Sequence, residues 1–109
     1  MPLYACWCHD GPDGVVLRER HLAAHLAYVE ANIGRYAVAG PLRTGGAVTG
    51  SLLVVMADSA SRARRFLECD PYFKAGIWAR MDIRAFAAVA GQWVGGAAWQ
   101  REGSGQQHR

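Results

Sequence analysis

Long apolar runs are missing from this chain of 109 residues. No stretch approaches the ~20 consecutive apolar residues that a membrane-spanning helix requires, so we expect neither a transmembrane segment nor a membrane partner. The first residues, MPLYACWCHDG, also lack the basic start and long apolar core of a secretory signal. The sequence therefore predicts a globular chain without a signal peptide.

Basic residues are present but form no cluster. Lys74 is the only lysine, the arginines are scattered, and the net charge is +3. Nucleic-acid-binding surfaces combine dense basic stretches with aromatic residues, and this chain has no such stretch. The segment GPLRTGG, residues 40–46, matches neither GxGxxG nor GxxxxGK, the patterns of phosphate-binding loops. We therefore expect no nucleic-acid partner and no nucleotide loop.

Cysteines are few, and their number is odd. Cys6 and Cys8 lie two apart, on one face of a predicted strand, where they are poorly placed for a disulfide. We expect both side chains to be buried, because free cysteines usually pack in the core as small apolar residues. Cys69 ends a predicted helix, whose dipole disfavours a thiolate at that end. We assign none of them a catalytic role, and free cysteines favour a cytoplasmic location.

The composition and length predict one small globular domain, because 51% of the residues are hydrophobic and 19% are charged. Helix 16–33 carries an apolar stripe at spacings of four, three and four, and this stripe is expected to face the core; its residues are Leu22, Leu26, Val29 and Ile33. Asp58 or Ser59 is suited to cap the second helix. The predicted strands are 2–8, 35–40, 51–57 and 79–89, the predicted helices are 16–33 and 59–69, and a short helical turn is expected at 73–78. This order predicts an α+β fold, the ferredoxin-like βαββαβ sandwich.

In such a sandwich the helices cover only one face of the sheet. Alternation along strand 79–89 places Arg80, Asp82, Arg84 and Phe86 on the other face. A bare and partly apolar face favours association with a second copy, so we expect a homodimer.

The last residues differ in composition from the rest. We expect a folded domain over residues 1–90 and a Gly- and Trp-containing tail over 91–109, with its end disordered. Trp93 and Trp99 are apolar enough to pack across a dimer or to cover a pocket. The alternative is a loosely docked arm.

Helix 16–33 also carries two histidines, His21 and His25, four residues apart. Such a pair can bind zinc, but it lacks the glutamate of HExxH, and further ligands would have to come from residues 8–10. We therefore predict no metal and place His21 on the surface. A neutral imidazole transfers protons best when a carboxylate holds its other nitrogen. Asp10 and Asp70 are the two available partners of His25.

Asp70 has two interpretations. It precedes Pro71, where a helix ends, so it serves either as a cap of the turn or as a site residue. Ser51 begins a strand and does not sit in the strand-to-helix elbow of a serine nucleophile, so we expect it to donate a hydrogen bond in a pocket.

Several segments together resemble the YCII-related family, and the resemblance runs from about Leu3 to Val89. They are DGP at 10–12, HLAYVEANIGRYAVAGPL at 25–42, GSLLVV at 50–55 and DPYFKAGIWARMDIRAF at 70–86. The resemblance implies the dimeric α/β-barrel type of ferredoxin-like fold and a small pocket with a characteristic histidine and aspartate. By motif, the histidine falls on His25, the DPY aspartate on Asp70 and the turn aspartate on Asp10. Arg18 matches a family arginine, whereas Leu22 replaces a second one.

We therefore predict a small enzyme, without metal or organic cofactor, that uses His25 with Asp10 or Asp70 to transfer a proton. Elimination and isomerisation of a small organic molecule, aromatic ones included, suit such a pair. We expect Arg18 and Ser51 to contact the substrate, and Tyr72, Trp78 and Phe86 to form apolar walls. The alternatives are a non-catalytic small-molecule-binding or accessory protein and a cofactorless ferredoxin-like monooxygenase.

Overall fold

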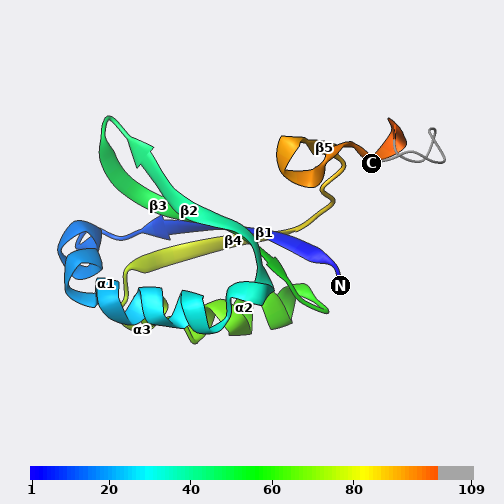
Figure 1. Cartoon of the computed structure of the whole chain (residues 1–109). Coiled ribbons are helices and arrows are strands. Elements are labelled where there is room, and N and C mark those ends of the chain that lie inside the picture. The colour runs from blue at the N-terminus through cyan, green and yellow to red at the C-terminus, as the bar shows by residue number, and fades with distance from the viewer. Residues whose placement is uncertain (101–109) are drawn as a thin grey trace.

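A single four-stranded antiparallel sheet, in the order β2-β3-β1-β4, forms the centre of the molecule. In the computed structural model, which describes residues 1–100, the α-helices lie together on one face of this sheet (Figure 1). The elements are β1 (Leu3–Asp10), α1 (Gly14–Ala31), η1 (Ile33–Arg35), β2 (Tyr36–Thr44), β3 (Ala47–Met56), α2 (Ala60–Glu68), α3 (Pro71–Lys74), β4 (Trp78–Phe86), β5 (Ala90–Gly91), η2 (Gln92–Val94) and β6 (Gly96–Ala97). The predicted ferredoxin-like α+β fold is confirmed.

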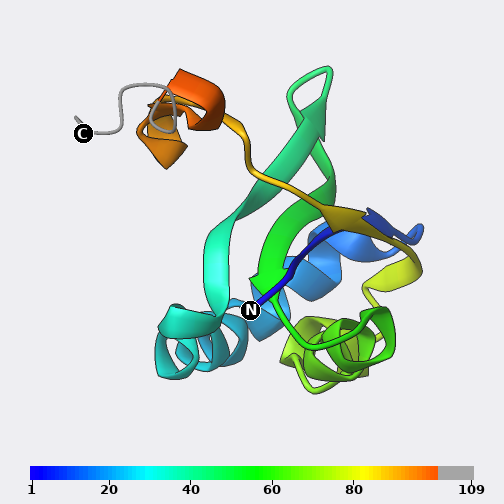
Figure 2. The same ribbon diagram turned by 90° about the vertical axis from the view of Figure 1, so that its right-hand side faces the viewer.

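The C-terminal residues form a separate small unit. After β4 the chain leaves the sheet, and the short strands β5 and β6 pair with each other around η2. We call residues 87–100 the arm; Figure 2 shows this orange segment standing away from the helices. The predicted disorder of the tail concerns residues 101–109, which lie outside the described residues.

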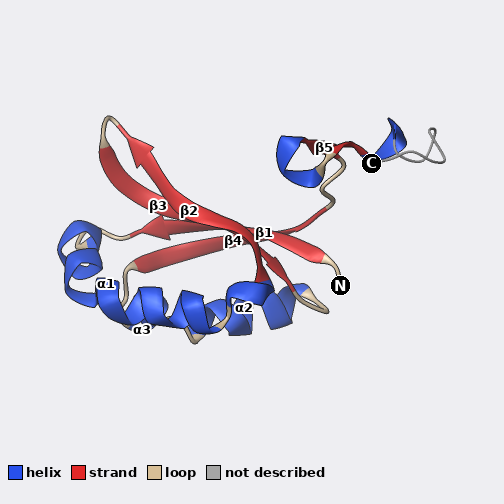
Figure 3. Ribbon diagram, in the orientation of Figure 1, coloured by secondary structure: helices blue, strands red, loops and turns tan. Residues whose placement is uncertain are grey.

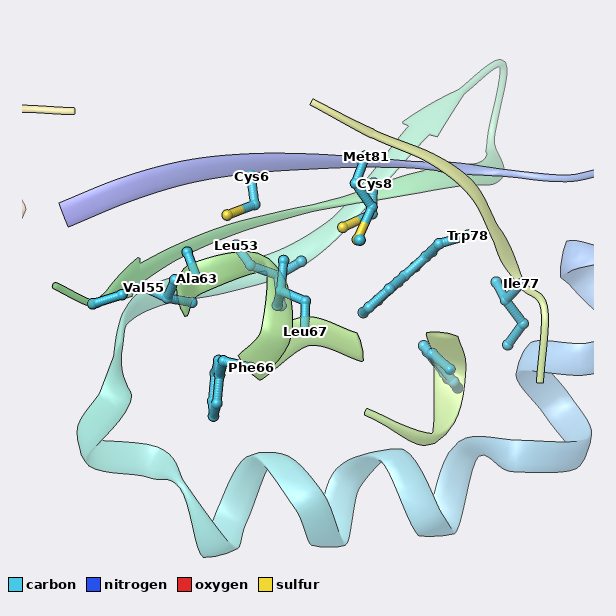
Figure 4. Packing of buried hydrophobic residues seen from close by; sticks show 12 residues of the cluster. Cys6, Cys8, Leu53, Val55, Ala63, Phe66, Leu67, Ile77, Trp78 and Met81 are labelled. Atoms are coloured by element: carbon cyan, nitrogen blue, oxygen red, sulfur yellow. The ribbon is translucent and has the colours of Figure 1, made fainter. Parts of the chain in front are cut away.

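The hydrophobic core lies between the sheet and the helices. Strand side chains alternate between faces, so Cys6 and Cys8 of β1 are buried whereas Trp7 is exposed on the other face (Figure 3 shows the layers). Helix α2 contributes Phe66 and Leu67 to this core, and Figure 4 shows both side chains on the side of the sheet that the helices cover. We call the opposite, uncovered side of the sheet the open face.

Two helices begin directly after a residue whose side chain caps the helix N-terminus. Ser59, one of the two predicted caps of α2, accepts a hydrogen bond from the backbone N–H of Arg62. Helix α3 starts at Pro71, two residues before the predicted turn at 73–78, because Asp70 caps it and proline suits the first helical position.

Helix α1 is rotated relative to the sequence prediction. Its apolar stripe does not face the core: Leu22, Leu26 and Ile33 are 47%, 46% and 65% exposed. A neighbouring polar stripe, formed by Arg18, His25 and Tyr28, faces inward instead, because these side chains have buried partners. The hydroxyl of Tyr28, for example, donates to the carbonyl of Phe66 at 2.7 Å. An unmade hydrogen bond to a buried group costs about 1–3 kcal/mol, enough to outweigh partial exposure of a leucine.

Candidate active site

A cavity of about 260 Å³ lies between α1, α3 and the strands β2 and β3. We call it the His25 pocket. Its polar and aromatic lining comes from Arg18, His25, Ser51 and Tyr72, and its apolar lining includes the exposed leucines of α1. The segment Ala39–Gly40–Pro41 of β2 forms the opposite wall. The rotation of α1 therefore brings both its polar stripe and its apolar stripe to one cavity.

His25 and Asp70 form a hydrogen-bonded pair in this pocket. Nδ1 of His25 lies 2.9 Å from Oδ1 and 3.0 Å from Oδ2 of Asp70. The Asp70 side chain is fully buried, and the His25 side chain is 15% exposed. A carboxylate accepts hydrogen bonds, so Nδ1 carries the proton and Nε2 of the neutral ring keeps its lone pair.

Asp70 reaches this position through the local backbone. Its Oδ1 also accepts the backbone N–H of Tyr72 at 2.8 Å, which is the N-cap bond of α3. The extended backbone at Asp70, with φ −71° and ψ 135°, is the conformation that a following proline favours. One carboxylate thus caps a helix and orients an imidazole.

Aromatic contacts hold the imidazole ring in place. The rings of His25 and Tyr72 are stacked, with centroids 3.8 Å apart and an interplanar angle of 5°. Trp78 meets both rings edge-on, at 6.4 Å from His25 and 6.0 Å from Tyr72. Tyr72 lines the pocket, whereas Trp78 is buried behind these rings. Burial raises the pKa of the Tyr72 phenol, so this hydroxyl stays protonated at neutral pH.

Asp10 is paired with Arg18 and not with His25. Nε and Nη2 of Arg18 donate to the two oxygens of Asp10 at 2.7 and 2.9 Å, and Nη2 also donates to Oγ of Ser51 at 2.9 Å. The Arg18 guanidinium lies 5.1 Å from the centre of the Tyr72 ring. Because Asp10 balances its charge, Arg18 offers the pocket an oriented donor more than a net positive charge.

The start of α1 leaves room for this ion pair. Gly14 is buried, and a Cβ atom built there would lie 2.6 Å from Oδ2 of Asp10. No real Cβ contact is that short, so a side chain at this position would displace Asp10.

Phe86 does not belong to the His25 pocket, and the expectation that it forms one of its walls is wrong. It lies on the open face, is 46% exposed and lines a different hollow. The alternation of β4 explains this, because Phe86 shares its parity with Asp82 and not with buried Met81. From the sequence, Leu22 and Leu26 were not assigned to the pocket. The sequence does place both of them on the first helix beside His21 and His25.

The remaining histidines of the described chain lie elsewhere. On the open face, Nε2 of His9 lies 2.9 Å from Oδ2 of Asp82, and the His9 ring stacks on Trp7. His21 lies on α1 but is not among the residues that line the His25 pocket. Among residues 1–100, no group of three or more His, Cys, Asp or Glu side chains is placed to hold a metal ion. No helix in this part of the chain is long and apolar enough to cross a membrane.

Three known proteins are similar to this chain in sequence, and for one of them the similarity extends to the structure. Protein YciI of Escherichia coli O6:H1 (strain CFT073) is 27% identical over 96 residues, covering 80% of this chain and 98% of its own. Protein YciI of Shigella flexneri gives the same values. Among solved structures, 5-chloro-2-hydroxyhydroquinone dehydrochlorinase (TftG) of Burkholderia phenoliruptrix AC1100, in complex with 2,5-dihydroxybenzoquinone, is 31% identical with a TM-score of 0.73. That likeness covers 83% of this chain and 96% of the dehydrochlorinase chain.

The family assignment rests on more than single relatives. The YCII-related domain matches residues 2–87, which include every strand of the main sheet and every residue of the His25 pocket. The arm lies almost entirely beyond this range. The chain therefore belongs to the YCII-related domain family, as its motifs predicted.

Proposed function

We propose that this chain is a small enzyme in which His25 transfers a proton in an elimination or isomerisation, without a metal or organic cofactor. One observation carries the proposal: Nδ1 of His25 is held by buried Asp70, while no hydrogen bond engages Nε2 among the described residues. Because His25 lines the cavity, that nitrogen is available to a bound molecule. A base held by a carboxylate and open on its other side suits proton transfer.

In an elimination, Nε2 takes the proton from a C–H or O–H group of the substrate. The bonding electrons form a new double bond, and the leaving group departs with its own electron pair. The imidazolium, stabilised by the Asp70 carboxylate, then returns the proton to the leaving group or to water. In an isomerisation the same proton returns to another atom of the substrate. Such proton transfer contributes about 10²–10⁴-fold, and positioning in the pocket supplies the rest.

The pocket suits a small hydroxylated molecule. Its volume of about 260 Å³ lies just below the ~300–1,000 Å³ of drug-sized sites, which fits a molecule of about one ring. Apolar walls from Leu22 and Leu26 suit a ring face, whereas Arg18 and Ser51 are polar groups suited to its hydroxyls. The similar dehydrochlorinase was solved with a dihydroxybenzoquinone, which supports the same class of ligand here.

The test is turnover of chlorinated and hydroxylated quinols, beginning with 5-chloro-2-hydroxyhydroquinone, with products identified by mass spectrometry. We expect His25→Ala to lower kcat at least about 100-fold. His25→Asn keeps an N–H donor for Asp70 but cannot take a proton, so it should be equally inactive and better folded. His21→Ala, one helical turn away, is the matched control and should stay active. Full turnover by folded His25→Asn would end the proposal.

The same screen separates the alternatives. A ligand that raises the melting temperature yet is recovered unchanged supports a non-catalytic binding or accessory protein. Oxygen uptake that follows substrate consumption supports a cofactorless monooxygenase. Release of chloride without oxygen uptake supports elimination.

We also infer that two copies associate through the open face. Trp7, Leu52 and Phe86 are 50%, 39% and 46% exposed on that face, and sheets that present apolar side chains in this way commonly pack on a partner. The fold is that of the dimeric α/β-barrel type, which supports a homodimer of this kind. Sedimentation equilibrium of the whole chain tests it directly.

A further inference from the structure

The arm is folded on itself more than on the body of the protein. The backbone N–H of Ala98 donates to the carbonyl of Val89 at 2.8 Å, which closes the hairpin of β5 and β6. Yet its apolar side chains remain uncovered: Val89, Trp93 and Trp99 are 50%, 86% and 62% exposed. Tryptophans with so much exposed surface are unusual in a monomeric protein, and they mark surfaces at which another molecule binds.

The arm and the open face enclose one concave surface. A hollow of about 560 Å³ is lined on one side by sheet residues such as Val54 and Phe86, and on the other side by arm residues including Ala90 and Trp93. Figure 1 shows the arm and the tip of the β2–β3 hairpin both rising on the side of the sheet away from the helices. We call this hollow the trough; the open face forms its floor and the arm forms its other wall.

The exposed area is large enough for a stable contact. At the roughly 150–250 Å² that each aromatic side chain can bury, the exposed parts of Trp7, Phe86, Trp93 and Trp99 offer about 370–610 Å². Each partner in a standard interface contributes about 800 Å² in total, so these four residues supply much of it. In a two-fold dimer the same patch meets itself, and this patch includes both a floor and a protruding arm.

Resting on the dimer proposed above, we propose that the arm is a clasp that holds the second copy against the open face, with Trp93 as its main contact. The occupant of the trough is thus a second copy of this chain, and the arm of each copy contacts the other. The arm lies almost wholly outside the residues that match the family, so this contact is a property of this chain's own C-terminal segment.

The test is the dimer dissociation constant of the full chain, measured by sedimentation equilibrium, in the wild type and in Trp93→Ser. We expect at least a tenfold rise in this constant, because truncation of a buried interface tryptophan is commonly that costly. Val15→Ser is the matched control: Val15 is 66% exposed, but it lies on α1, away from the open face. Far-UV circular dichroism reports whether each variant is folded.

Two results overturn the clasp. The first is that Trp93→Ser leaves the dissociation constant unchanged while Phe86→Ser raises it. The two sheets would then form the interface without a contribution from the arm. A full chain that is monomeric at every concentration removes both the interface and the clasp. Neither result bears on the proposed catalysis, because the loss of turnover in His25→Asn is measured in a separate experiment. A blue shift of tryptophan emission on dimerisation that is lost in Trp93→Ser supports the clasp.

Discussion

Asp70 Oδ1 lies 2.9 Å from Nδ1 of His25 and accepts the backbone N–H of Tyr72 at 2.8 Å. The sequence left two interpretations open for Asp70, helix cap and partner of an imidazole. One oxygen of its carboxylate makes both contacts. A fully buried carboxylate requires hydrogen-bond donors, and the helix start and the histidine ring supply them. The fold and the site consequently share a residue.

This sharing predicts different effects for two substitutions of Asp70. Asp70→Ala removes the cap, at about 1 kcal/mol, and leaves the Nδ1–H of His25 unpaired, at about 1–3 kcal/mol. Asp70→Asn keeps a capping oxygen, so we expect a loss of free energy of unfolding below about 2 kcal/mol. Because the amide carries no charge to stabilise an imidazolium, turnover should still fall at least about 100-fold. Urea denaturation and the quinol assay measure the two effects.

The other side-chain cap provides the control for Asp70. Ser59→Ala removes the bond to the N–H of Arg62 at the start of α2, away from the pocket. It should lower the free energy of unfolding by about 1 kcal/mol without changing kcat. An Asp70→Asn variant as active as the wild type would show that the carboxylate is needed only for folding.

Gly14 and Gly34 form a matched pair at the two ends of the first helical region. A Cβ at Gly14 would meet Oδ2 and Cβ of Asp10 at 2.6 and 2.9 Å, so Gly14→Ala should destabilise the fold by about 1–3 kcal/mol. Nothing lies within 4 Å of a Cβ at Gly34, so Gly34→Ala should be neutral or stabilise by up to about 1 kcal/mol. Urea denaturation of both variants measures this, and equal effects would contradict the described packing of Asp10.

Alkaline pH should destabilise the protein through its buried thiols. Burial raises the pKa of Cys6 from 9.0 to about 11 and raises that of Cys8 as well. The unfolded chain therefore releases these protons at lower pH than the folded chain. The stabilising effect is complete below pH 9 and is lost as the pH rises toward the folded pKa, by about 2–3 kcal/mol for Cys6 alone.

Urea denaturation at pH 8 and pH 10 measures the first part of this loss, about 1.3 kcal/mol for Cys6. In Cys6→Ala one titrating group is removed, so the decrease between the two pH values should be smaller than in the wild type. The same burial predicts that a thiol reagent at neutral pH modifies Cys69, which is exposed, before Cys6 or Cys8. Equal pH dependence in the wild type and in Cys6→Ala would contradict the inference.

The fold was predictable because its signals are local. Alternation of small apolar and aromatic residues in β1, the capping serine of α2 and the Asp-Pro helix start each act over a few residues. Their order along the chain then allows few topologies. The histidine and the aspartates of the site were also identifiable, because their motifs resemble those of the family.

The rotation of α1 and the pairing of the carboxylates were not predictable in this way. Periodicity predicted that Leu22 and Leu26 face the core, whereas the structure turns them to the pocket. The turn depends on hydrogen bonds between α1 and residues 8 to 45 positions distant in the chain, such as Asp10 and Asp70. The apolar stripe alone does not contain that information.

From its residues alone, this chain determined a ferredoxin-like α+β fold with its polar site residues on the first helix, because helical and strand periods are written in neighbouring residues. Only the tertiary structure decided that Asp70 holds His25 while Asp10 holds Arg18, and that Phe86 faces away from both. The physical reason is that a buried carboxylate binds whichever donor the packed backbone brings within about 3 Å, and that proximity arises only when distant segments meet.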